Sequence, residues 1–205
     1  SAASDVYKRQ GWDDTGPAII VECQPLPFRQ RAHYYRDGLK VIIPSVRRTP
    51  PEMLSPRTKT HNYLNLVMAD LEVQAQDPKA WAVLLDQNGN LCEGLGSNIF
   101  VVKNGRLLTP RSQFVLAGVS RGTVIDLAAE LGVDCEECDI DLYDAYTADE
   151  AFLTSTSLCI CPISSFNGTP IAGGQAPGAI TRRLMDAFSD TAGMDFEEQY
   201  LAHLD

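Results

Sequence analysis

The sequence predicts an α+β protein in which a mixed sheet packs against a few helices. Apolar segments are joined by the turns Asn88–Gly89, Asn104–Gly105 and Asn167–Gly168, which favour antiparallel hairpins. Residues 62–77 and 121–131 instead carry apolar side chains at helical spacing. Because strands and helices do not alternate regularly, a doubly wound parallel sheet is not expected.

In the first half of the chain, residues 18–23 form an apolar run that Pro25 ends, and residues 38–43 form a second one that Pro44 stops. Both runs predict strands. Residues 49–56 are rich in proline and predict a loop. A helix is expected next, because apolar side chains recur at near-helical spacing: Leu64, Val67, Met68, Leu71 and Val73.

In the second half, Ser120 is expected to cap a helix that Gly132 ends, and residues 178–188 predict a final helix. Glu93 is expected just after a strand that follows the Asn88–Gly89 turn. The other strands are expected at residues 81–86, 98–102, 106–108, 133–138, 150–153 and 158–161.

The chain has 205 residues and a formal net charge of −10, which argues against binding to nucleic acid. Arg47–Arg48 and Arg182–Arg183 are isolated basic pairs and make no patch. No apolar stretch approaches the roughly 20 residues that a membrane helix needs. A soluble, cytoplasmic protein is therefore expected.

Six cysteines are present, and the absence of a signal peptide predicts that they are reduced and mostly buried. Cys135 and Cys138 have the spacing of a metal-binding or redox pair. A structural zinc site needs four ligands, and no second such pair exists, so no metal site is expected.

Four segments carry a pattern with chemical meaning. They are KTHNY (59–63), EGLGSNIF (93–100), LAGVSR (116–121) and DEAFLTST (149–156). In this order the segments resemble class IV (fold-type IV) aminotransferases, the pyridoxal-phosphate (PLP) enzymes that include branched-chain and D-amino-acid aminotransferases. The resemblance spans residues 18–190 and implies the C-terminal large domain of that fold, a mixed sheet or pseudo-barrel with helices.

The resemblance makes Lys59 the catalytic residue. It would hold PLP as an aldimine and then move a proton between the substrate's α carbon and the cofactor, as lysine amines can. Taken alone, a lysine is usually solvated at the surface. Glu93 would keep the ring nitrogen protonated, so that the ring accepts electrons. Tyr63 would lie near the ring oxygen.

The LAGVSR segment would begin a helix, whose free N–H groups and positive end favour an anion. The resemblance assigns the PLP phosphate to this place, bound by Val119, Ser120 and the hydroxyl of Thr156. An ordinary helix cap is the alternative for Ser120. The resemblance further places Ser97, Asn98 and Leu116 at the cofactor, and Gly96 and Ser157 at the substrate.

Three regions are expected along the chain. Residues 1–10 have neither a starting methionine nor the features of a targeting segment, and suggest a remnant of cloning or sequence assembly. Residues 11–37 would be what remains of the N-terminal small domain and its linker, and residues 38–205 the PLP-binding large domain. The phosphate-binding arginine of the small domain has no recognisable counterpart in Arg29, Arg31 or Arg36.

The resemblance implies an aminotransferase that exchanges an amino group between an amino donor, with a branched-chain amino acid favoured, and a 2-keto acid. Two alternatives stay open: a lyase of the aminodeoxychorismate type, and a truncated PLP-binding fragment with little or no activity. A homodimer is the expected assembly, because a second copy would cover apolar surface left exposed without the small domain.

Overall fold

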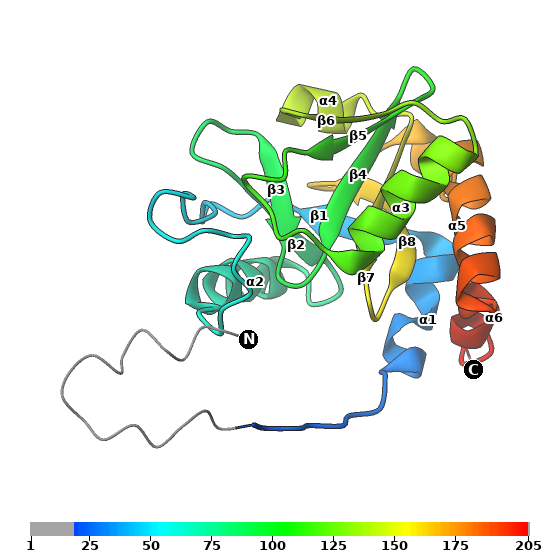
Figure 1. Ribbon diagram of the computed structural model, residues 1–205, viewed down its shortest axis with the longest axis horizontal. Helices are drawn as coiled ribbons and strands as arrows, with labels where there is room; N and C mark the ends of the chain where they lie inside the picture. The colour runs from blue at the N-terminus through cyan, green and yellow to red at the C-terminus, as the bar shows by residue number, and fades with distance from the viewer. Residues whose placement is uncertain (1–18, 205) are drawn as a thin grey trace.

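A computed structural model describes residues 19–204 (Figure 1). Its helices are α1 (Phe28–Asp37), α2 (Leu64–Gln76), α3 (Val119–Glu130), α4 (Leu142–Tyr146), α5 (Ala179–Ala192) and α6 (Phe196–Leu201), with a short 3₁₀ turn at Ala172–Gly174. Its strands are β1 (Leu39–Ile42), β2 (Trp81–Leu85), β3 (Leu91–Gly94), β4 (Asn98–Lys103), β5 (Arg106–Pro110), β6 (Cys135–Cys138), β7 (Glu150–Ser155), β8 (Cys159–Phe166) and β9 (Thr169–Pro170).

The strands form one mixed sheet in the order β3-β2-β1-β8-β7-β4-β5-β6. A further pairing of Glu93 on β3 with Asn98 on β4 joins the two ends of the run from β3 to β4, which closes it into a barrel-like circuit. β1 pairs in parallel with both β2 and β8, whereas the hairpins pair antiparallel. The expected α+β class with a mixed, barrel-like sheet is confirmed.

Two apolar clusters hold the helices to the sheet. The larger lies beneath α1, α3, α5 and α6, and contains Phe100 and Phe152, whose stacked rings lie 5.0 Å apart. Burial of such large side chains is the main favourable contribution to folding. The smaller cluster joins α2 to β2 through Leu66, Ala69 and Leu84. Figure 1 shows α2 apart from the other helices, beside β2 and β3.

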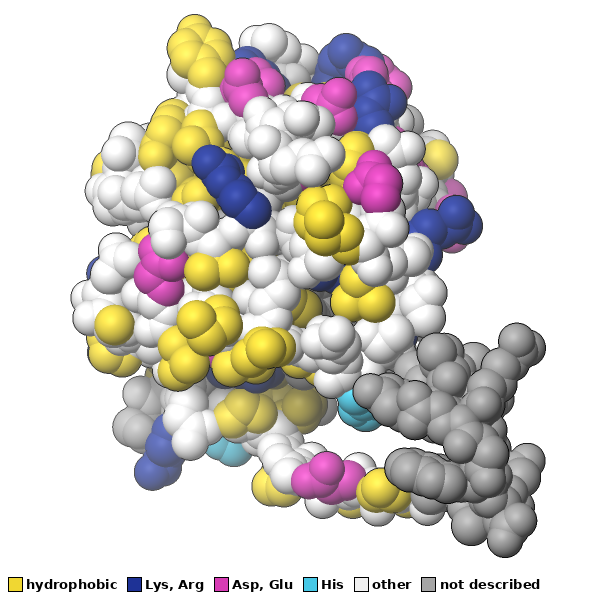
Figure 2. Space-filling view, turned by 90° about the vertical axis from the view of Figure 1, so that its left-hand side faces the viewer, with side chains coloured by type: hydrophobic (Ala, Val, Ile, Leu, Met, Phe, Trp, Pro, Cys, Tyr) yellow, Lys and Arg dark blue, Asp and Glu magenta, His cyan; other side chains and the backbone are white. Residues whose placement is uncertain are grey.

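The outer side of α2 is apolar and open to solvent. Four side chains spaced along one helix face remain 39–69% exposed: Leu64, Val67, Met68 and Leu71. Figure 2, which looks onto the side of the molecule that carries α2, shows hydrophobic side chains gathered over this face. Apolar patches of this kind mark surfaces that other protein segments cover.

Most expected elements are confirmed, usually within two residues of their bounds. Asn104 and Gly105 both have positive φ angles, 52° and 75°, as the tight turn between β4 and β5 requires. Glu93, however, lies within β3 rather than after a strand.

The strand expected at residues 18–23 is wrong over its described part, residues 19–23. Ile19 and Ile20 are 86% and 88% exposed. Within the described part of the chain no strand pairs with them, so their apolar pattern has no sheet edge on which to form a ladder. Ala18 lies outside the described residues.

The helix cap expected at Ser120 is also wrong. Helix α3 begins at Val119, two residues earlier than expected, and Gly118 is its N-cap, with an extended backbone at φ −66° and ψ 141°. Ser120 therefore lies inside the first turn.

Three helices have no counterpart among the expected elements: α1, α4 and α6. α1 packs on α6 through aromatic side chains, with the rings of Tyr35 and Tyr200 stacked at 4.5 Å. Tyr34 and Tyr35 belong to the same core as β1, so this core continues across residues 37 and 38. Within the described residues, none of the helices is both long and apolar enough to cross a membrane.

The six cysteines are free thiols in different surroundings. Burial raises the pKa of the Cys92 thiol to about 12, and Cys161 is fully buried. Cys135 and Cys138 lie three residues apart on β6, so their side chains point to opposite faces of the strand. In the part of the chain that is described, no three His, Cys, Asp or Glu side chains come together as metal ligands.

We expect Cys23, the exposed cysteine, to be alkylated much faster than Cys92 and Cys161 in the folded protein, because only an accessible thiolate reacts. Mass spectrometry after brief treatment with iodoacetamide at pH 8 would show this order. Cys23→Ser should remove the fast phase. Equal labelling of Cys23 and Cys92 without denaturant would contradict the burial of β3.

Candidate active site

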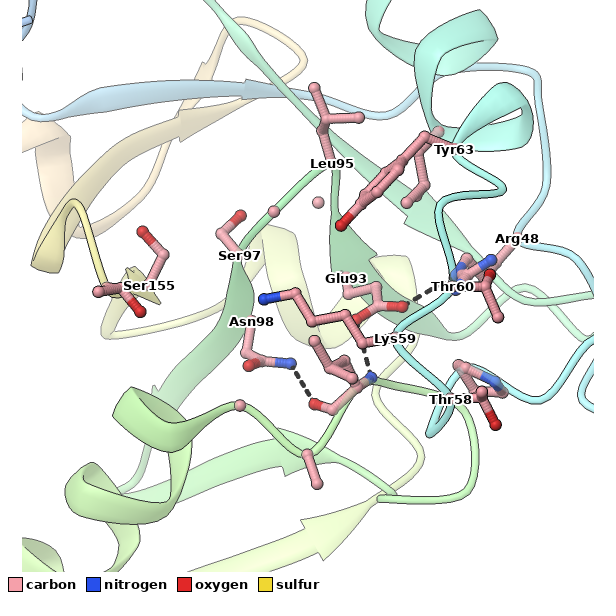
Figure 3. Close-up of a pocket in the computed structure, with 18 of the residues that line it drawn as sticks. Arg48, Thr58, Lys59, Thr60, Tyr63, Glu93, Leu95, Ser97, Asn98 and Ser155 are labelled. Carbon is pink, nitrogen blue, oxygen red and sulfur yellow. Dashed lines mark hydrogen bonds and ion pairs between the residues drawn. The ribbon is translucent and has the colours of Figure 1, made fainter. Parts of the chain in front are cut away.

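A cavity of about 390 Å³ lies between the loop before α2, the β3–β4 turn and the start of α3 (Figure 3). It is where the residues singled out in the sequence meet. All of them except Ser157 line it: Lys59, Tyr63, Glu93, Gly96, Ser97, Asn98, Leu116, Val119, Ser120 and Thr156. The fold thus brings the four sequence segments together from separate elements.

Lys59 lies in the loop that leads into α2, and its side chain crosses the cavity. Figure 3 shows its amine pointing towards Ser97 and Asn98, with the Tyr63 hydroxyl directed into the same space. Among the ion pairs of the described residues, none involves Lys59. Its amine is therefore available to a ligand in the cavity.

Glu93 lies on β3, and its carboxylate forms part of the cavity wall. The residue is only 5% exposed. One oxygen, Oε1, accepts a bond from Arg48 Nε at 2.9 Å, and the other, Oε2, accepts from the Leu116 backbone N–H at 2.9 Å. Burial raises the pKa of Glu93, while the Leu116 N–H and Arg48 lower it. A carboxylate has about four lone-pair sites, so further acceptor capacity remains for a ligand.

The backbone of Leu116 is held on both sides of its α carbon. Its N–H donates to Glu93, and its carbonyl accepts from Asn98 Nδ2 at 3.0 Å. Gly118 follows so closely that a Cβ there would lie 2.2 Å from Asn98 Oδ1, so a larger residue would displace this amide. Glu93 and the start of α3 are thereby fixed relative to one another.

The start of α3 offers unpaired backbone donors. Its N-cap, Gly118, provides no side-chain cap, and the N–H groups of Val119 and Ser120 have no acceptor within the helix. Together with the positive end of the helix dipole, these donors favour an anion. Thr156 also lines the cavity, in the loop between β7 and β8.

That loop, residues 156–158, is held from behind by α1 and α6. Arg31 Nη1 donates to Ser157 Oγ at 2.9 Å, the Tyr35 hydroxyl donates to Leu158 O at 2.5 Å, and the Tyr200 hydroxyl donates to Ser157 O. Ser157 therefore faces these helices behind the cavity, beside the lining residues. Its assignment to the substrate stays a prediction, as do the roles of the lining residues.

The residues present fit a PLP molecule. An amine, a buried carboxylate and a set of free backbone donors lie on one cavity, which matches the aldehyde, ring nitrogen and phosphate of that molecule. The Ser97 hydroxyl is buried and has no hydrogen-bond partner among residues 19–204, so a polar ligand would satisfy it.

Arg48 is the main site residue that the sequence did not reveal. Its pairing with Glu93 is nearly buried, with side chains 11% and 6% exposed, whereas the sequence suggested only an isolated basic pair with Arg47. The two partners are 45 residues apart, and only the adjacency of β1, β2 and β3 joins them. A charged residue just after a predicted strand was the available signal.

Comparisons with known proteins agree with this geometry. The family described as "Amino-transferase class IV" matches residues 6–166. A Methanocaldococcus jannaschii protein named for branched-chain-amino-acid aminotransferase activity is 43% identical over 155 residues, 75% of this chain and 53% of that protein. The branched-chain-amino-acid aminotransferase of Escherichia coli K12 is 31% identical over 172 residues, 83% of this chain and 55% of that protein.

Solved structures show the same fold. The branched-chain amino acid aminotransferase of Thermobaculum terrenum, in its PLP form, superimposes with a TM-score of 0.72 at 37% identity, covering 84% of this chain and 56% of that one. The E. coli enzyme gives a TM-score of 0.72 at 32% identity, covering 75% and 51%. The expected fold-type IV architecture is confirmed. The chain spans about half the length of the curated relatives it matches.

Proposed function

Because the chain belongs to the class IV aminotransferases, we propose that it binds PLP in this cavity and transfers amino groups between an amino acid and a 2-keto acid. The observation that carries the proposal is the meeting of the Lys59 amine, the Glu93 carboxylate and the open start of α3 on one cavity. These groups come from separate elements of the fold, and together they match the aldehyde, the ring nitrogen and the phosphate of a single cofactor.

When bound, PLP supplies an aldehyde that an amine can attack and a ring that withdraws electrons from the substrate's α carbon. In this proposal the Lys59 amine would hold the cofactor covalently, with the aldehyde oxygen leaving as water. Once an incoming amino group displaces it, the amine would move the proton at the α carbon. Glu93 holds the proton at the ring nitrogen. The N–H groups of Val119 and Ser120, with the hydroxyl of Thr156, bind the phosphate.

A branched-chain amino acid is the proposed amino donor. The name of the matched relatives supports it, as do the apolar side chains in the cavity wall, among them Leu54, Leu66 and Leu95. Such side chains would contact an aliphatic substrate and exclude water from it. Ser97, Asn98 and Leu116 would position the cofactor, and Gly96 and Ser157 the substrate.

We further propose three properties of the protein. These are a homodimer, a cytoplasmic location and the division into residues 11–37 and 38–205. The exposed apolar face of α2 supports the homodimer, because a second copy would shield it.

The visible absorbance spectrum of the purified protein with added PLP tests the proposed function. We expect a yellow band that bleaches on addition of L-leucine, L-isoleucine or L-valine, and returns when a 2-keto acid follows. D-amino acids, tested in parallel, report the stereochemical preference. Pyruvate release from aminodeoxychorismate is the signature of the lyase alternative.

A band that forms but never bleaches with any donor would contradict transamination and favour a fragment that binds PLP without turning over. If no band forms at any PLP concentration, the cofactor assignment itself fails.

A further inference from the structure

The backbone at Arg48 is held in place by three hydrogen bonds from two elements. Its own N–H donates to Leu85 O at the end of β2, at 2.9 Å. The side-chain amide of Asn65, on α2, binds the backbone on both sides of Arg48. Its Nδ2 donates to Arg47 O at 2.7 Å, and its Oδ1 accepts from the Thr49 N–H at 3.0 Å. Arg48 is thus fixed to the sheet and to the helix that follows Lys59.

From this anchored position the guanidinium reaches across to β3. Arg48 Nε lies 2.9 Å from Glu93 Oε1, and both side chains are nearly buried. Buried ion pairs add little net stability, because removing two charges from water offsets most of their attraction. The pair therefore calls for a role in the site, and both of its members line the cavity.

We infer that Arg48 is a positioning residue that keeps the Glu93 carboxylate charged and directed into the cavity. The consequence for catalysis rests on the proposed function: a charged Glu93 can hold the proton of a pyridine nitrogen, whereas a neutral, protonated Glu93 cannot take up that proton. Arg48 acts through Glu93.

The surroundings of Glu93 make Arg48 its main source of compensating charge. The other charged or titratable groups near the carboxylate are Lys59 and Tyr63 across the cavity, Cys92 beside it on β3 and, beyond Cys92, Asp86 after β2. Burial opposes the charged form of Glu93, and the Leu116 N–H and Arg48 favour it. Loss of Arg48 should therefore shift Glu93 towards its neutral form.

The first test needs no cofactor. In protein labelled with ¹³C at the glutamate carboxyl carbon, the Glu93 signal is assigned by its loss in Glu93→Gln and followed as a function of pH. We expect its midpoint to move to higher pH in Arg48→Met and to return towards the wild-type value in Arg48→Lys. Arg47→Met is the matched control, since it removes the same charge from the neighbouring, exposed side chain and should leave the midpoint unchanged.

The second test measures PLP affinity by fluorescence quenching. At neutral pH, Arg48→Met should weaken binding about tenfold or more, as loss of a charge-assisted contact does. The loss should shrink at a pH high enough to ionise Glu93 in both proteins. A purely structural role for Arg48 would weaken binding equally at every pH.

An unchanged Glu93 midpoint in Arg48→Met, or an equal loss of affinity at all pH values, overturns the inference. If Arg48→Met does not fold, Arg48→Gln carries the same tests with a polar replacement. A shifted midpoint in a protein that binds no PLP would leave the role of Arg48 towards Glu93 standing and remove the proposed function instead.

Discussion

Lys59→Ala is expected to abolish both covalent attachment of PLP and amino-group transfer. The variant loses the amine that holds the cofactor and the group that moves the substrate proton, and general acid–base catalysis alone is worth about 10²–10⁴-fold. Turnover should therefore fall by about 10²–10⁴-fold from the lost proton transfer alone, and further because the cofactor is no longer attached. The measurements are borohydride reduction followed by mass spectrometry of the protein, and turnover with L-leucine and a keto acid.

Lys79→Ala is the matched control, because Lys79 is exposed and does not line the cavity. It should retain the adduct and most of the activity. Since Lys59 is itself exposed in the loop before α2, its replacement should leave thermal unfolding close to that of the wild type. An adduct of undiminished yield in Lys59→Ala would assign the cofactor to another lysine.

At saturating PLP, Glu93→Gln is expected to retain the covalently attached cofactor, with an affinity weakened as in Arg48→Met, and to lower turnover by about 10²–10³-fold, the usual cost of removing one preorganised electrostatic partner. Glutamine keeps the size of the side chain and can still accept the Leu116 N–H, but it carries no charge to hold a proton at the ring nitrogen. Steady-state kinetics and the borohydride-trapped adduct, measured on the same samples, separate turnover from attachment.

Glu93→Gln also leaves the Arg48 guanidinium buried without its counter-charge, and breaking a buried pair in this way costs about 3–5 kcal/mol. Thermal unfolding of the variant should therefore be measured as well, and the kinetics should be recorded below its unfolding midpoint. Glu130→Gln, at the exposed end of α3, removes one carboxylate outside the cavity and should behave as the wild type. Near-normal turnover in Glu93→Gln would refute its role at the ring nitrogen.

Local chemistry explains which elements could be predicted from the sequence. The turns at Asn104–Gly105 and Asn167–Gly168 require positive φ angles that these residues adopt readily, so the hairpins around them are readable. α2 is readable because a regular apolar pattern covers both its buried and its exposed face. The strand expected at residues 18–23 was wrong because a strand also needs a partner, which no local pattern supplies.

The helices that escaped prediction depend on distant contacts. α1 is rich in arginine, and its aromatic side chains are buried by packing against α6, which lies more than 160 positions later in the chain. α4 and α6 are five and six residues long, too short for a periodic signal. The same limit applies to Arg48, whose importance depends on a carboxylate two strands away.

More of the candidate site than of the surrounding fold could be predicted from the sequence. Lys59, Glu93 and Val119 were found through a family resemblance, and the cavity brings them together. The resemblance did not show that Asn98 holds the Leu116 carbonyl, or that Ser157 faces α1 and α6. Those contacts depend on side-chain geometry, which sequence segments do not carry.

Helix α6 supports the loop at residues 156–158, and this contact forms late in biosynthesis. The Tyr200 hydroxyl donates a hydrogen bond to Ser157 O, and Tyr200 follows Ser157 by 43 positions. The loop is therefore synthesised before the residue that supports it. A chain that stopped before α6 would contain every strand from β1 to β8 and still lack this support behind Thr156. The pocket reaches its final shape only once α6 has been translated and has docked on α1.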